Sequence, residues 1–436
     1  MKFGGTSVGN SDRIKNVASI VKSYIKKNPV VVVSAVTKIT DNLIKLAKES
    51  AEDKRDETFD LIKKTHYKII EQLELDKSLI ENDLQELSNL VNKTKSNKNI
   101  DEEILDYFQS FGERISSKIV AEQLNKIGVK AKAYNSWELG FLTDAEFGSA
   151  EPLAIAYTNL KNNIKKLNHI PVITGFIGKT EAGDITTLGR GGSDYTAAII
   201  GAAIGAEEIQ IWTDVDGIMT TDPRIVKNAK TIEKVSFEEA SELAYFGARV
   251  LHPKTILPAM DKNIPVKVLN SFNPKGKGTT IVNKAGKADR TVKAIACKKN
   301  ITVVHIDSTR MLGAYGFLAR IFDIFDDYKK SIDVVTTSEV SVSLTIDNGE
   351  NLNYIVNELK EFADVEVAND KAVICVVGEG MKYTPGIGGA TFTALGKKKI
   401  NVEMISQGAS KINVTFVVDG KDADKAVKTL HQEFFG

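Results

Sequence analysis

Residues 29–35 read PVVVVSA, an apolar run between two stretches with helical patterning. In the stretch before it, residues 11–27, apolar side chains recur at the spacing of one helix face. A strand that is apolar at every position is buried on both faces, which is typical of a parallel sheet covered by helices. The run therefore predicts an α/β fold.

Strand and helix patterns alternate on the C-terminal side of this run, as far as about residue 282. The further elements that we expect are strands at 129–133, 171–175 and 208–213 and helices at 121–128 and 194–205. Residues 42–99 interrupt the alternation, because they are rich in Lys, Glu and Asp and show helical spacing only. This segment predicts an inserted helical hairpin.

A basic segment rich in glycine and lysine ends the α/β body, which we place at residues 1–290. The part that follows contains an internal repeat, since Met311 recurs as Met381 at an offset of 381 − 311 = 70 residues. Each copy has the order strand, glycine turn, helix, two strands and helix. We therefore expect two α+β units of ferredoxin-like topology, at 300–370 and 371–436.

Composition excludes several classes of protein. The chain has 436 residues, of which 42% are hydrophobic and 26% charged, and the formal net charge is +1. These values are those of a folded, multidomain protein and exclude a disordered or collagen-like chain. The near-neutral balance of charge gives no general attraction to nucleic acid or to a membrane surface, so binding must occur at local sites.

The distribution of cysteines and apolar residues predicts a cytoplasmic protein. Cys297 and Cys375 lie far apart and form no Cys-x-x-Cys pair, which is typical of buried thiols in a reducing compartment. The longest apolar stretch, residues 197–206, is much shorter than the roughly 20 residues of a membrane span. The first residues do not have the pattern of a targeting peptide.

Three segments carry the features of a phosphate or carboxylate site. They are KFGGTS at 2–7, TTLGRGGSD at 186–194 and WTDVDGIMTTDPR at 212–224. Glycines let an anion approach backbone N–H groups, and the forked guanidinium of arginine fits carboxylates and phosphates. Structural interpretations remain open: a turn with a solvated Lys2 for the first segment, and an N-cap at Ser193 or Asp194 for the second.

Other known site patterns are absent from the sequence. Gly178-Lys179-Thr180 has Ile173 where a Walker motif requires glycine, and no G-x-G-x-x-G sequence is present. The five histidines are scattered, without neighbours at metal-ligand spacing. We therefore expect neither a P-loop, nor a dinucleotide fold, nor a metal ion held by protein ligands alone.

Four motifs together resemble those of the aspartate kinase (aspartokinase) family: residues 2–8, Phe111-Gly112-Glu113, 189–194 and 212–224. The C-terminal repeat is similar to that family's pair of ACT domains, so the resemblance covers the whole chain. It implies the amino-acid-kinase fold, a three-layer α/β/α sandwich with a mainly parallel sheet, followed by two ACT units. The chain is most similar to the single-function, lysine-inhibited form of the family.

The resemblance implies transfer of a phosphoryl group from ATP, with Mg²⁺, to the side-chain carboxylate of L-aspartate. The products are 4-phospho-L-aspartate and ADP, and the reaction is the first step of Lys, Thr and Met biosynthesis. A carboxylate with an ordinary pKa of about 3.9 is ionised at neutral pH and needs no general base. The reaction depends instead on charge neutralisation and in-line positioning. We expect phosphates to help hold the Mg²⁺.

The family motifs imply the roles of residues around the substrate. Lys2 would contact the transferring phosphoryl group, Arg190 would bind the substrate α-carboxylate, and these two with Asp194 are the expected catalytic residues. Without the resemblance, Glu113 would be an acid favoured by a helix dipole and Phe176 a core residue. The expected substrate-binding residues are Ser34, Thr40, Glu113, Phe176, Arg190, Ser193 and Asp194.

The expected ATP-binding residues are Lys2, Gly4, Gly5, Thr213, Asp214, Asp222, Arg224 and Arg249. Two positions depart from the family pattern. Met219 stands where relatives often have tyrosine, and Arg249 stands where a lysine is expected to reach the phosphates. Arginine keeps the charge but changes its reach and geometry, and Lys254 offers a second cation nearby in the sequence.

The first repeat carries the family positions that bind L-lysine where two ACT units pair. These residues are Met311, Gly316, Phe317, Leu318, Ser331, Asp333, Thr337, Ser338 and Glu339. In the second repeat, Gly408 and Ala409 replace Ser338 and Glu339, which removes the acid. We therefore expect one class of effector site, in a homodimer or larger assembly formed through the ACT units.

Two alternative functions are open at this point. Another kinase of the same superfamily, acting on glutamate or acetylglutamate, would share the phosphate-binding segments but usually lacks the repeated tail. A non-enzymatic amino-acid sensor with a degenerate kinase body would use the tail alone. The sensor is the weaker alternative, because Lys2, Arg190 and Asp194 are all present.

Overall fold

The structure, a computed structural model, describes residues 1–52, 57–246, 251–286, 290–313, 315–347, 349, 351–408 and 412–436. The described residues form two compact units. The first comprises those within 1–218, 233–237 and 250–284, and the second comprises those within 219–232, 238–249 and 285–436. Two short segments from inside the expected catalytic body are therefore grouped with the C-terminal part.

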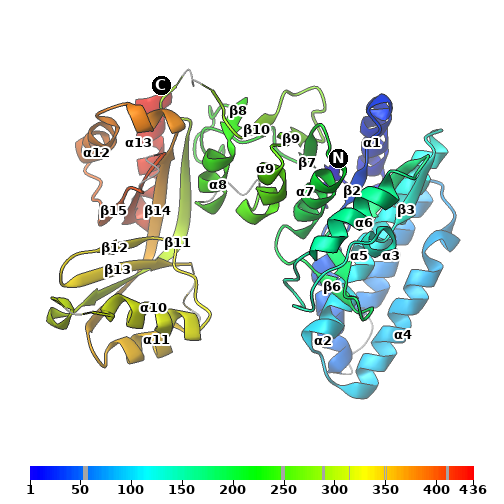
Figure 1. The fold of residues 1–436 in the computed structure, drawn as a ribbon, viewed down its shortest axis with the longest axis horizontal. Coiled ribbons are helices and arrows are strands. Elements are labelled where there is room, and N and C mark those ends of the chain that lie inside the picture. The colour runs from blue at the N-terminus through cyan, green and yellow to red at the C-terminus, as the bar shows by residue number, and fades with distance from the viewer. Residues whose placement is uncertain are drawn as a thin grey trace. The chain divides into compact units, whose positions relative to one another are not determined.

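The first unit is built on an eight-stranded sheet (Figure 1). Its strands in spatial order are β3 (Ala131–Tyr134), β4 (Ile170–Thr174), β2 (Val31–Val33), β1 (Lys2–Phe3), β7 (Ile209–Thr213), β9 (Val266–Asn270), β10 (Thr279–Val282) and β8 (Lys234–Ser236). All neighbouring strands are parallel except β9 and β10. The three valines of β2 are at most 1% exposed, which confirms the buried parallel strand predicted from the valine run.

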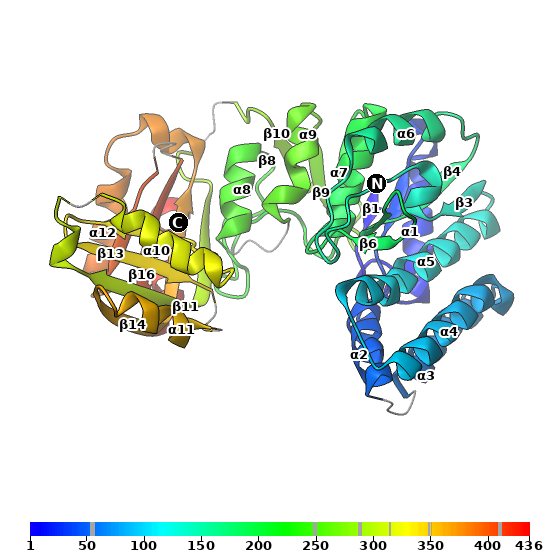
Figure 2. The same ribbon diagram turned by 60° about the horizontal axis from the view of Figure 1, so that its bottom comes forward.

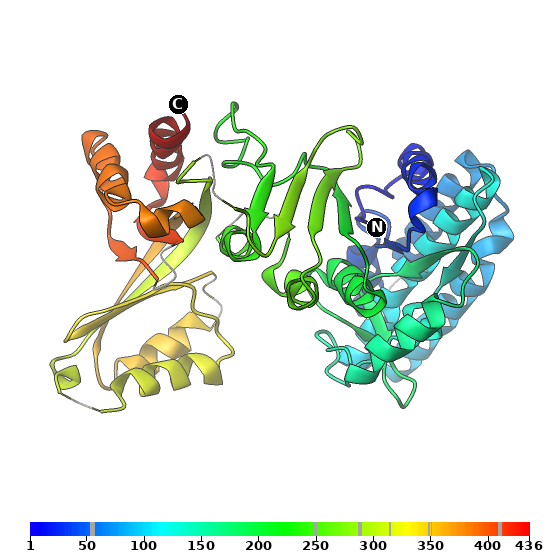
Figure 3. The ribbon, with the colours of Figure 1, turned by 45° about the horizontal axis from the view of Figure 1, so that its top comes forward.

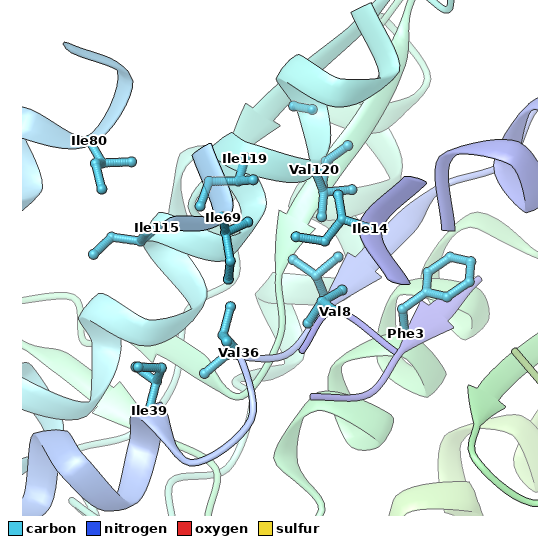
Figure 4. Close-up of a cluster of buried hydrophobic side chains, with 14 of the residues drawn as sticks. Phe3, Val8, Ile14, Val36, Ile39, Ile69, Ile80, Ile115, Ile119 and Val120 are labelled. Atoms are coloured by element: carbon cyan, nitrogen blue, oxygen red, sulfur yellow. The ribbon is translucent and has the colours of Figure 1, made fainter. Parts of the chain in front are cut away.

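Helices cover both faces of this sheet, which confirms the three-layer α/β/α sandwich. On one face, α1 (Ser11–Ser23) and α5 (Glu102–Lys126) bury a shared core, in which Figure 4 shows Phe3, Val8 and Ile14. On the other face lies α7 (Gly192–Ile204), against which α6 (Ala154–Ile164) and α9 (Leu257–Asp261) pack. A Cβ atom at Gly201 would lie 2.6 Å from Ile209, so glycine allows α7 to approach β7 closely.

The inserted helices are α2 (Ile39–Ala51), α3 (Glu57–Gln72) and α4 (Glu81–Asn97). Helices α3 and α4 both pack against α2 (Figure 2), and their apolar residues share the core of α1 and α5. The segment is thus an extension of the core of the first unit rather than a separate module. Its expected start at residue 42 lies inside α2, whose first turn belongs to the body of the unit.

Helix α1 is shorter than the helix predicted at 11–27. It ends at Ser23, and Ile25–Lys27 form a 3₁₀ turn. Asn28 then adopts a left-handed conformation with φ 49° before Pro29. A residue before proline is disfavoured in the right-handed helical region, which explains why no helical structure continues past Lys27.

The second unit contains a six-stranded antiparallel sheet. Its strands in spatial order are β12 (Val335–Thr337), β13 (Ser341–Ile346), β11 (Ala294–Asp307), β14 (Asp364–Val377), β16 (Asn413–Asp419) and β15 (Met404–Ser406). Its helices are α8 (Phe237–Tyr245, within the unit from residue 238), α10 (Phe317–Asp327), α11 (Leu352–Leu359), α12 (Ile387–Lys397) and α13 (Ala423–Phe435). None of the described helices is both long and apolar enough to span a membrane.

The two long strands β11 and β14 serve both repeats (Figure 3). Residues 302–307 of β11 pair with β13, whereas residues 294–299 pair with residues 372–377 of β14. Each repeat has its own buried apolar cluster. The second repeat therefore takes one strand from before the first repeat, a contribution that the expected range 371–436 does not include.

Candidate active site

The carboxyl ends of the central strands meet at one edge of the first sheet. Strands β1, β2, β4 and β7 are mutually parallel, and each is followed directly by a turn. The residues after these strands are Gly4, Ser34, Gly175 and Asp214. This edge is where open α/β sheets bind ligands, and it brings together segments that are far apart in the sequence.

Lys2 lies on the central strand β1 and points to the face covered by α7. Its Nζ atom is 2.7 Å from Oδ1 of Asp194, and both side chains are largely buried. The turn after Lys2 is close-packed, because a Cβ atom at Gly5 would lie 2.9 Å from the carbonyl oxygen of Ala35. The cation of the first motif is therefore held against the acid of the second rather than solvated.

The glycine-rich loop before α7 exposes backbone and charge together. Gly189 and Gly191 have φ values of 71° and 74°, a region that favours glycine. Gly191 itself is the N-cap of α7, so the expectation of an N-cap at Ser193 or Asp194 is wrong. These two residues lie in the first helical turn instead, where the helix dipole favours the carboxylate of Asp194 and its side chain can pair with Lys2.

A pocket of about 810 Å³ lies beside this ion pair, within the first unit. All seven residues expected to bind the substrate line it: Ser34, Thr40, Glu113, Phe176, Arg190, Ser193 and Asp194. Lys2 and Gly5 from the expected ATP set line the same pocket. Their roles stay predictions, but the structure places the two glycine-rich motifs on one cavity.

Phe176 has a backbone conformation that no sequence pattern indicates. Its φ is 66°, in the left-handed region, which is a strained conformation for an aromatic residue. Its N–H donates to Oγ1 of Thr196 at 3.0 Å, and its ring lies close to Gly192. The conformation directs Phe176 to the pocket wall, which is the place that the family resemblance assigns to it.

Glu113 is 2% exposed and lies on α5. Its Oε1 atom accepts a hydrogen bond from the N–H of Ala35 at 2.9 Å, whereas its Oε2 atom is buried without a protein partner. Burial raises the pKa of Glu113 to about 8, although the bond from Ala35 and the charge of Lys2 oppose the shift. An unsatisfied carboxylate oxygen on a ligand pocket is well placed to accept a bond from a substrate cation.

Asp106 is a site residue that the sequence does not reveal. It is fully buried on α5, where Oδ2 accepts bonds from Gly148 N–H at 2.9 Å and Thr187 N–H at 2.7 Å. Its Oδ1 atom accepts a third bond from the Thr187 hydroxyl at 2.7 Å. Gly148 and Thr187 both line the pocket, so Asp106 fixes two of its walls. No local motif marks Asp106, because its partners are distant in the sequence.

Residues 1–270 match the sequence model of the amino acid kinase family, and residues 374–434 match that of the ACT domain. The chain is 42% identical to the Arabidopsis thaliana protein named aspartokinase 1, chloroplastic, in a match that covers 100% of this chain and 80% of the relative. The chain belongs to the aspartokinase family. Another member, lysine-sensitive aspartokinase 3 of Escherichia coli (strain K12), is 38% identical, with 100% of this chain and 98% of the relative covered.

A solved aspartokinase structure agrees with this assignment over the whole chain. The crystal structure of E. coli aspartokinase III in complex with aspartate and ADP has a TM-score of 0.86 and a sequence identity of 36%. The match covers 100% of this chain and 99% of that chain. The resemblance seen in the sequence motifs and the amino-acid-kinase fold are both confirmed.

The nucleotide positions expected from the aspartokinase family lie on both units. Thr213 ends β7 in the first unit, with its hydroxyl 3.2 Å from a carboxylate oxygen of Asp214. In the second unit, Asp222 accepts bonds from the Arg224 guanidinium at 3.0 and 2.6 Å. This pairing lowers the pKa of Asp222, with the hydrogen bond from Arg224 as the main cause. None of these four residues lines the pocket of Lys2.

Two expected phosphate contacts from the aspartokinase pattern have different outcomes. Arg249 lies outside the described residues. Lys254 forms an ion pair with Glu151 and lies 5.6 Å from the ring centre of Tyr195. Tyr195 in turn donates to Glu151 at 2.8 Å, so Lys254 is engaged in a local network on α7.

The aspartokinase effector positions do not all meet in one cavity. A pocket of about 670 Å³ in the second unit is lined by six of the nine expected residues: Met311, Gly316, Phe317, Leu318, Ser338 and Glu339. Ser331, Asp333 and Thr337 do not line it. Asp333 is instead paired with Lys298 and Tyr245.

In the described part of the chain, no group of three or more His, Cys, Asp or Glu side chains is arranged to hold a metal ion. The acids of the pocket, Glu113 and Asp194, are separately engaged with Ala35 and Lys2.

Proposed function

We propose that the chain transfers the γ-phosphoryl group of ATP to the side-chain carboxylate of L-aspartate, giving 4-phospho-L-aspartate and ADP. This is the first step of Lys, Thr and Met biosynthesis. The observation that carries the proposal is the pocket in which Lys2, Arg190, Glu113 and Asp194 meet. Two cations and two acids match the charges of two ligands. One is an amino acid with two carboxylates and one ammonium group, and the other is a phosphoryl donor. Relatives named aspartokinases, and a related structure holding aspartate and ADP, support this choice.

In the proposed mechanism the protein positions charges and removes no proton. The aspartate side chain is already ionised, so it attacks the γ-phosphorus directly. The Lys2 ammonium, held by Asp194, stabilises negative charge on the transferring phosphoryl oxygens. The charge of Lys2 interacts more strongly with the phosphoryl oxygens in this mostly buried position than it would in water.

The same pocket orients the amino-acid substrate. Arg190 binds the α-carboxylate with its planar fork, and Glu113 accepts a hydrogen bond from the α-ammonium group at its unsatisfied oxygen. An ammonium group beside Glu113 opposes the effect of burial on its pKa and favours the carboxylate form. Binding of aspartate and ionisation of Glu113 are therefore linked.

The residues present fit a metal that arrives with the nucleotide. The pocket offers cations to phosphates, while Asp194, its acid that pairs with Lys2, is already engaged. When bound with the nucleotide, Mg²⁺ would supply additional positive charge beside Lys2. Gly5 lines the same pocket beside Lys2, whereas Gly4 does not line it and donates its N–H to the carbonyl oxygen of Trp212 at 3.2 Å.

We also propose that L-lysine inhibits the enzyme through the first ACT unit and that this unit forms a homodimer. Glu339 offers a carboxylate to a cationic effector in the pocket of the second unit. Five large apolar side chains around or near this pocket are exposed: Leu312, Tyr315, Leu318, Phe322 and Val340. Burial of such a cluster by a second copy favours association. Light scattering of the purified chain tests the dimer.

A cytoplasmic location remains part of the proposal. Both cysteines are free thiols, which fits a reducing compartment. Burial raises the pKa of Cys375 to about 12 and that of Cys297 to about 11. Neither thiol is therefore activated for redox chemistry at neutral pH.

The deciding experiment measures ADP release from MgATP with L-aspartate and with L-glutamate, each with and without millimolar L-lysine. Turnover that requires aspartate and is suppressed by lysine supports both proposals. Turnover with glutamate alone favours another kinase of the superfamily. A non-catalytic sensor would gain thermal stability from lysine but none from MgATP, and would release no ADP.

A further inference from the structure

One face of α8 is bonded along its length to the regulatory strands and turns of the second unit. The residues on this face recur at helical spacing: Glu238, Glu239, Glu242 and Tyr245. Their partners are, in the same order, Lys382 at 3.4 Å, Lys293 at 2.8 Å, Asn413 at 2.6 Å and Asp333 at 2.6 Å. The first three partners belong to or flank the second repeat, and only the last belongs to the first repeat.

The contact at the end of α8 is an acid with two partners. The Asp333 side chain is only 4% exposed. One of its oxygens lies 2.7 Å from Nζ of Lys298, and the other accepts a hydrogen bond from the Tyr245 hydroxyl at 2.6 Å. Lys298 also pairs with Asp347, and its ammonium lies 5.3 Å from the centre of the Tyr245 ring. Asp333 thus links strand β11 to the last turn of α8.

Charge and burial show how strongly this acid depends on its partners. Burial raises the pKa of Asp333, as does the neighbouring Asp347, whereas Lys298 and Tyr245 lower it. A mostly buried carboxylate that loses its cation needs another one or takes up a proton. Asp333 is therefore a position at which one ammonium group can replace another.

This arrangement conflicts with a simple effector site. Asp333 is one of the two acids expected to bind lysine, yet it does not line the pocket that contains Glu339. The ammonium group that occupies it belongs to the chain itself. Lys298 presents the same chemical group as the side chain of an L-lysine effector.

We propose that the side chain of Lys298 competes with the lysine effector for Asp333. We also propose that Tyr245 transmits the replacement of one ammonium group by the other to α8. The inference rests on the proposed regulation by lysine and names its residues. Without effector, Lys298 and Tyr245 hold Asp333. When the effector ammonium takes the place of Lys298, the Asp333–Tyr245 hydrogen bond changes, and with it the end of a helix that follows strand β8 of the catalytic sheet directly. The effector can inhibit only if it binds this second arrangement better than the first.

The first test removes the competing cation. Lys298→Met keeps an unbranched side chain of similar length and leaves both acids without their internal ammonium group. We expect the dissociation constant of L-lysine, measured by calorimetry, to fall roughly fivefold or more, with the inhibitory concentration falling in parallel. The matched control is Lys299→Met, the next residue of β11, which pairs with Asp424. We expect the control to bind lysine as the unmodified chain does.

The second test separates the binding of L-lysine from the inhibition that this binding causes. Tyr245→Phe keeps the aromatic ring and removes only the hydroxyl that bonds to Asp333. We expect lysine to bind at least as tightly as before, while the maximal inhibition of ADP release falls. Tyr328→Phe is the control, because the Tyr328 hydroxyl donates to Glu358 within the first repeat.

The outcomes distinguish the inference from the function on which it rests. A chain that phosphorylates aspartate but binds no lysine overturns both the proposed regulation and the inference. A chain inhibited by lysine, in which Lys298→Met binds lysine within twofold of the unmodified protein or more weakly, overturns the inference alone. Full inhibition of Tyr245→Phe contradicts the role of Tyr245.

Discussion

The ammonium group of Lys2 lies 2.7 Å from a carboxylate oxygen of Asp194, joining the central strand to the first turn of α7. The pair links the two glycine-rich motifs. Because both side chains are largely buried, each needs the other as a counter-charge. Lys2 is thereby fixed at the carboxyl edge of the sheet, where a transferring phosphoryl group would lie.

Replacement of Lys2 by methionine tests its proposed role in phosphoryl transfer. The variant keeps the length of the side chain and loses its charge, so we expect kcat to fall roughly 100- to 1,000-fold. The KM for aspartate should change little, because the residues proposed to bind that substrate at its α-carboxylate and α-ammonium groups are Arg190 and Glu113. Initial rates of ADP release at saturating MgATP measure both constants.

Lys22→Met is the control for this variant. Lys22 lies on the exposed side of α1 and donates to the carbonyl oxygen of Ile127. It should keep the activity of the unmodified chain. A loss of only a few-fold in the Lys2 variant would show that Lys2 does not stabilise the transition state.

The fold could be predicted from the sequence where an element is determined by residues that are neighbours in the chain. The valines of β2 are buried on both faces because helices lie on each side of the sheet, and a continuous apolar run records that requirement. The start of α7 was predicted with the wrong cap, because Gly191 in a left-handed conformation takes the place of a side-chain cap. Pro29 explains why helical structure does not continue past Lys27, but no sequence pattern marks the end of α1 at Ser23.

The parts that sequence patterns miss depend on contacts between distant segments. Asp106 meets Thr187 across the fold, and no spacing in either segment records the contact. The left-handed conformation of Phe176 is set by its surroundings rather than by its residue type. The pairing of residues 294–299 with β14 likewise arises from the long ribbon of β11 and β14, so the repeat pattern does not reveal it.

The raised pKa of Glu113 predicts a dependence of stability on pH. Its pKa is about 8 in the folded chain, against an ordinary value of 4.5. The folded state therefore binds this proton more tightly than the unfolded state does, and stability is lost as the pH rises from about 4.5 to about 8. We expect the melting temperature of the unmodified chain, relative to that of Glu113→Gln, to be higher at pH 5.5 than at pH 8.5.

The comparison with glutamine isolates this one group, since the amide oxygen can still accept the bond from Ala35. All other titrating groups are shared, so their effects cancel in the difference between the two proteins. Equal differences at both pH values would mean that Glu113 is ionised in the folded state without substrate. Glu113→Gln should also raise the KM for aspartate by roughly 10-fold, because a charged hydrogen bond to the ammonium group is lost.

Asp106 is predicted to position the pocket walls without contacting substrate. Asp106→Ala leaves the N–H groups of Gly148 and Thr187 without their acceptor, so we expect the KM for aspartate to rise roughly 10- to 100-fold. Asp106→Asn should restore most of the affinity. Its amide oxygen can accept both N–H bonds, and the Thr187 hydroxyl can accept from its amide group.

The difference in the KM for aspartate between these two variants distinguishes a positioning role of Asp106 from a role of its charge. If the asparagine variant is as impaired as the alanine variant, the negative charge matters and the positioning role is wrong. Thr187→Val should raise the KM for aspartate by a smaller factor, because it removes one of the three hydrogen bonds. The KM for MgATP serves as an internal reference in all three variants.

Glu339 is predicted to be the acid through which the effector pocket selects a cation. It lines the pocket of the first ACT unit together with Ser338, and its position in the second repeat is not acidic. Glu339→Ala should raise the inhibitory concentration of L-lysine at least roughly 10-fold, because a charge-assisted hydrogen bond is lost. Uninhibited turnover should stay near that of the unmodified chain, since Glu339 is not among the residues that line the pocket of Lys2. Glu366→Ala, an exposed acid on β14, is the matched control and should keep full sensitivity to lysine. Unchanged inhibition of the Glu339 variant would place the effector elsewhere, and loss of turnover in both variants would indicate damage to the fold.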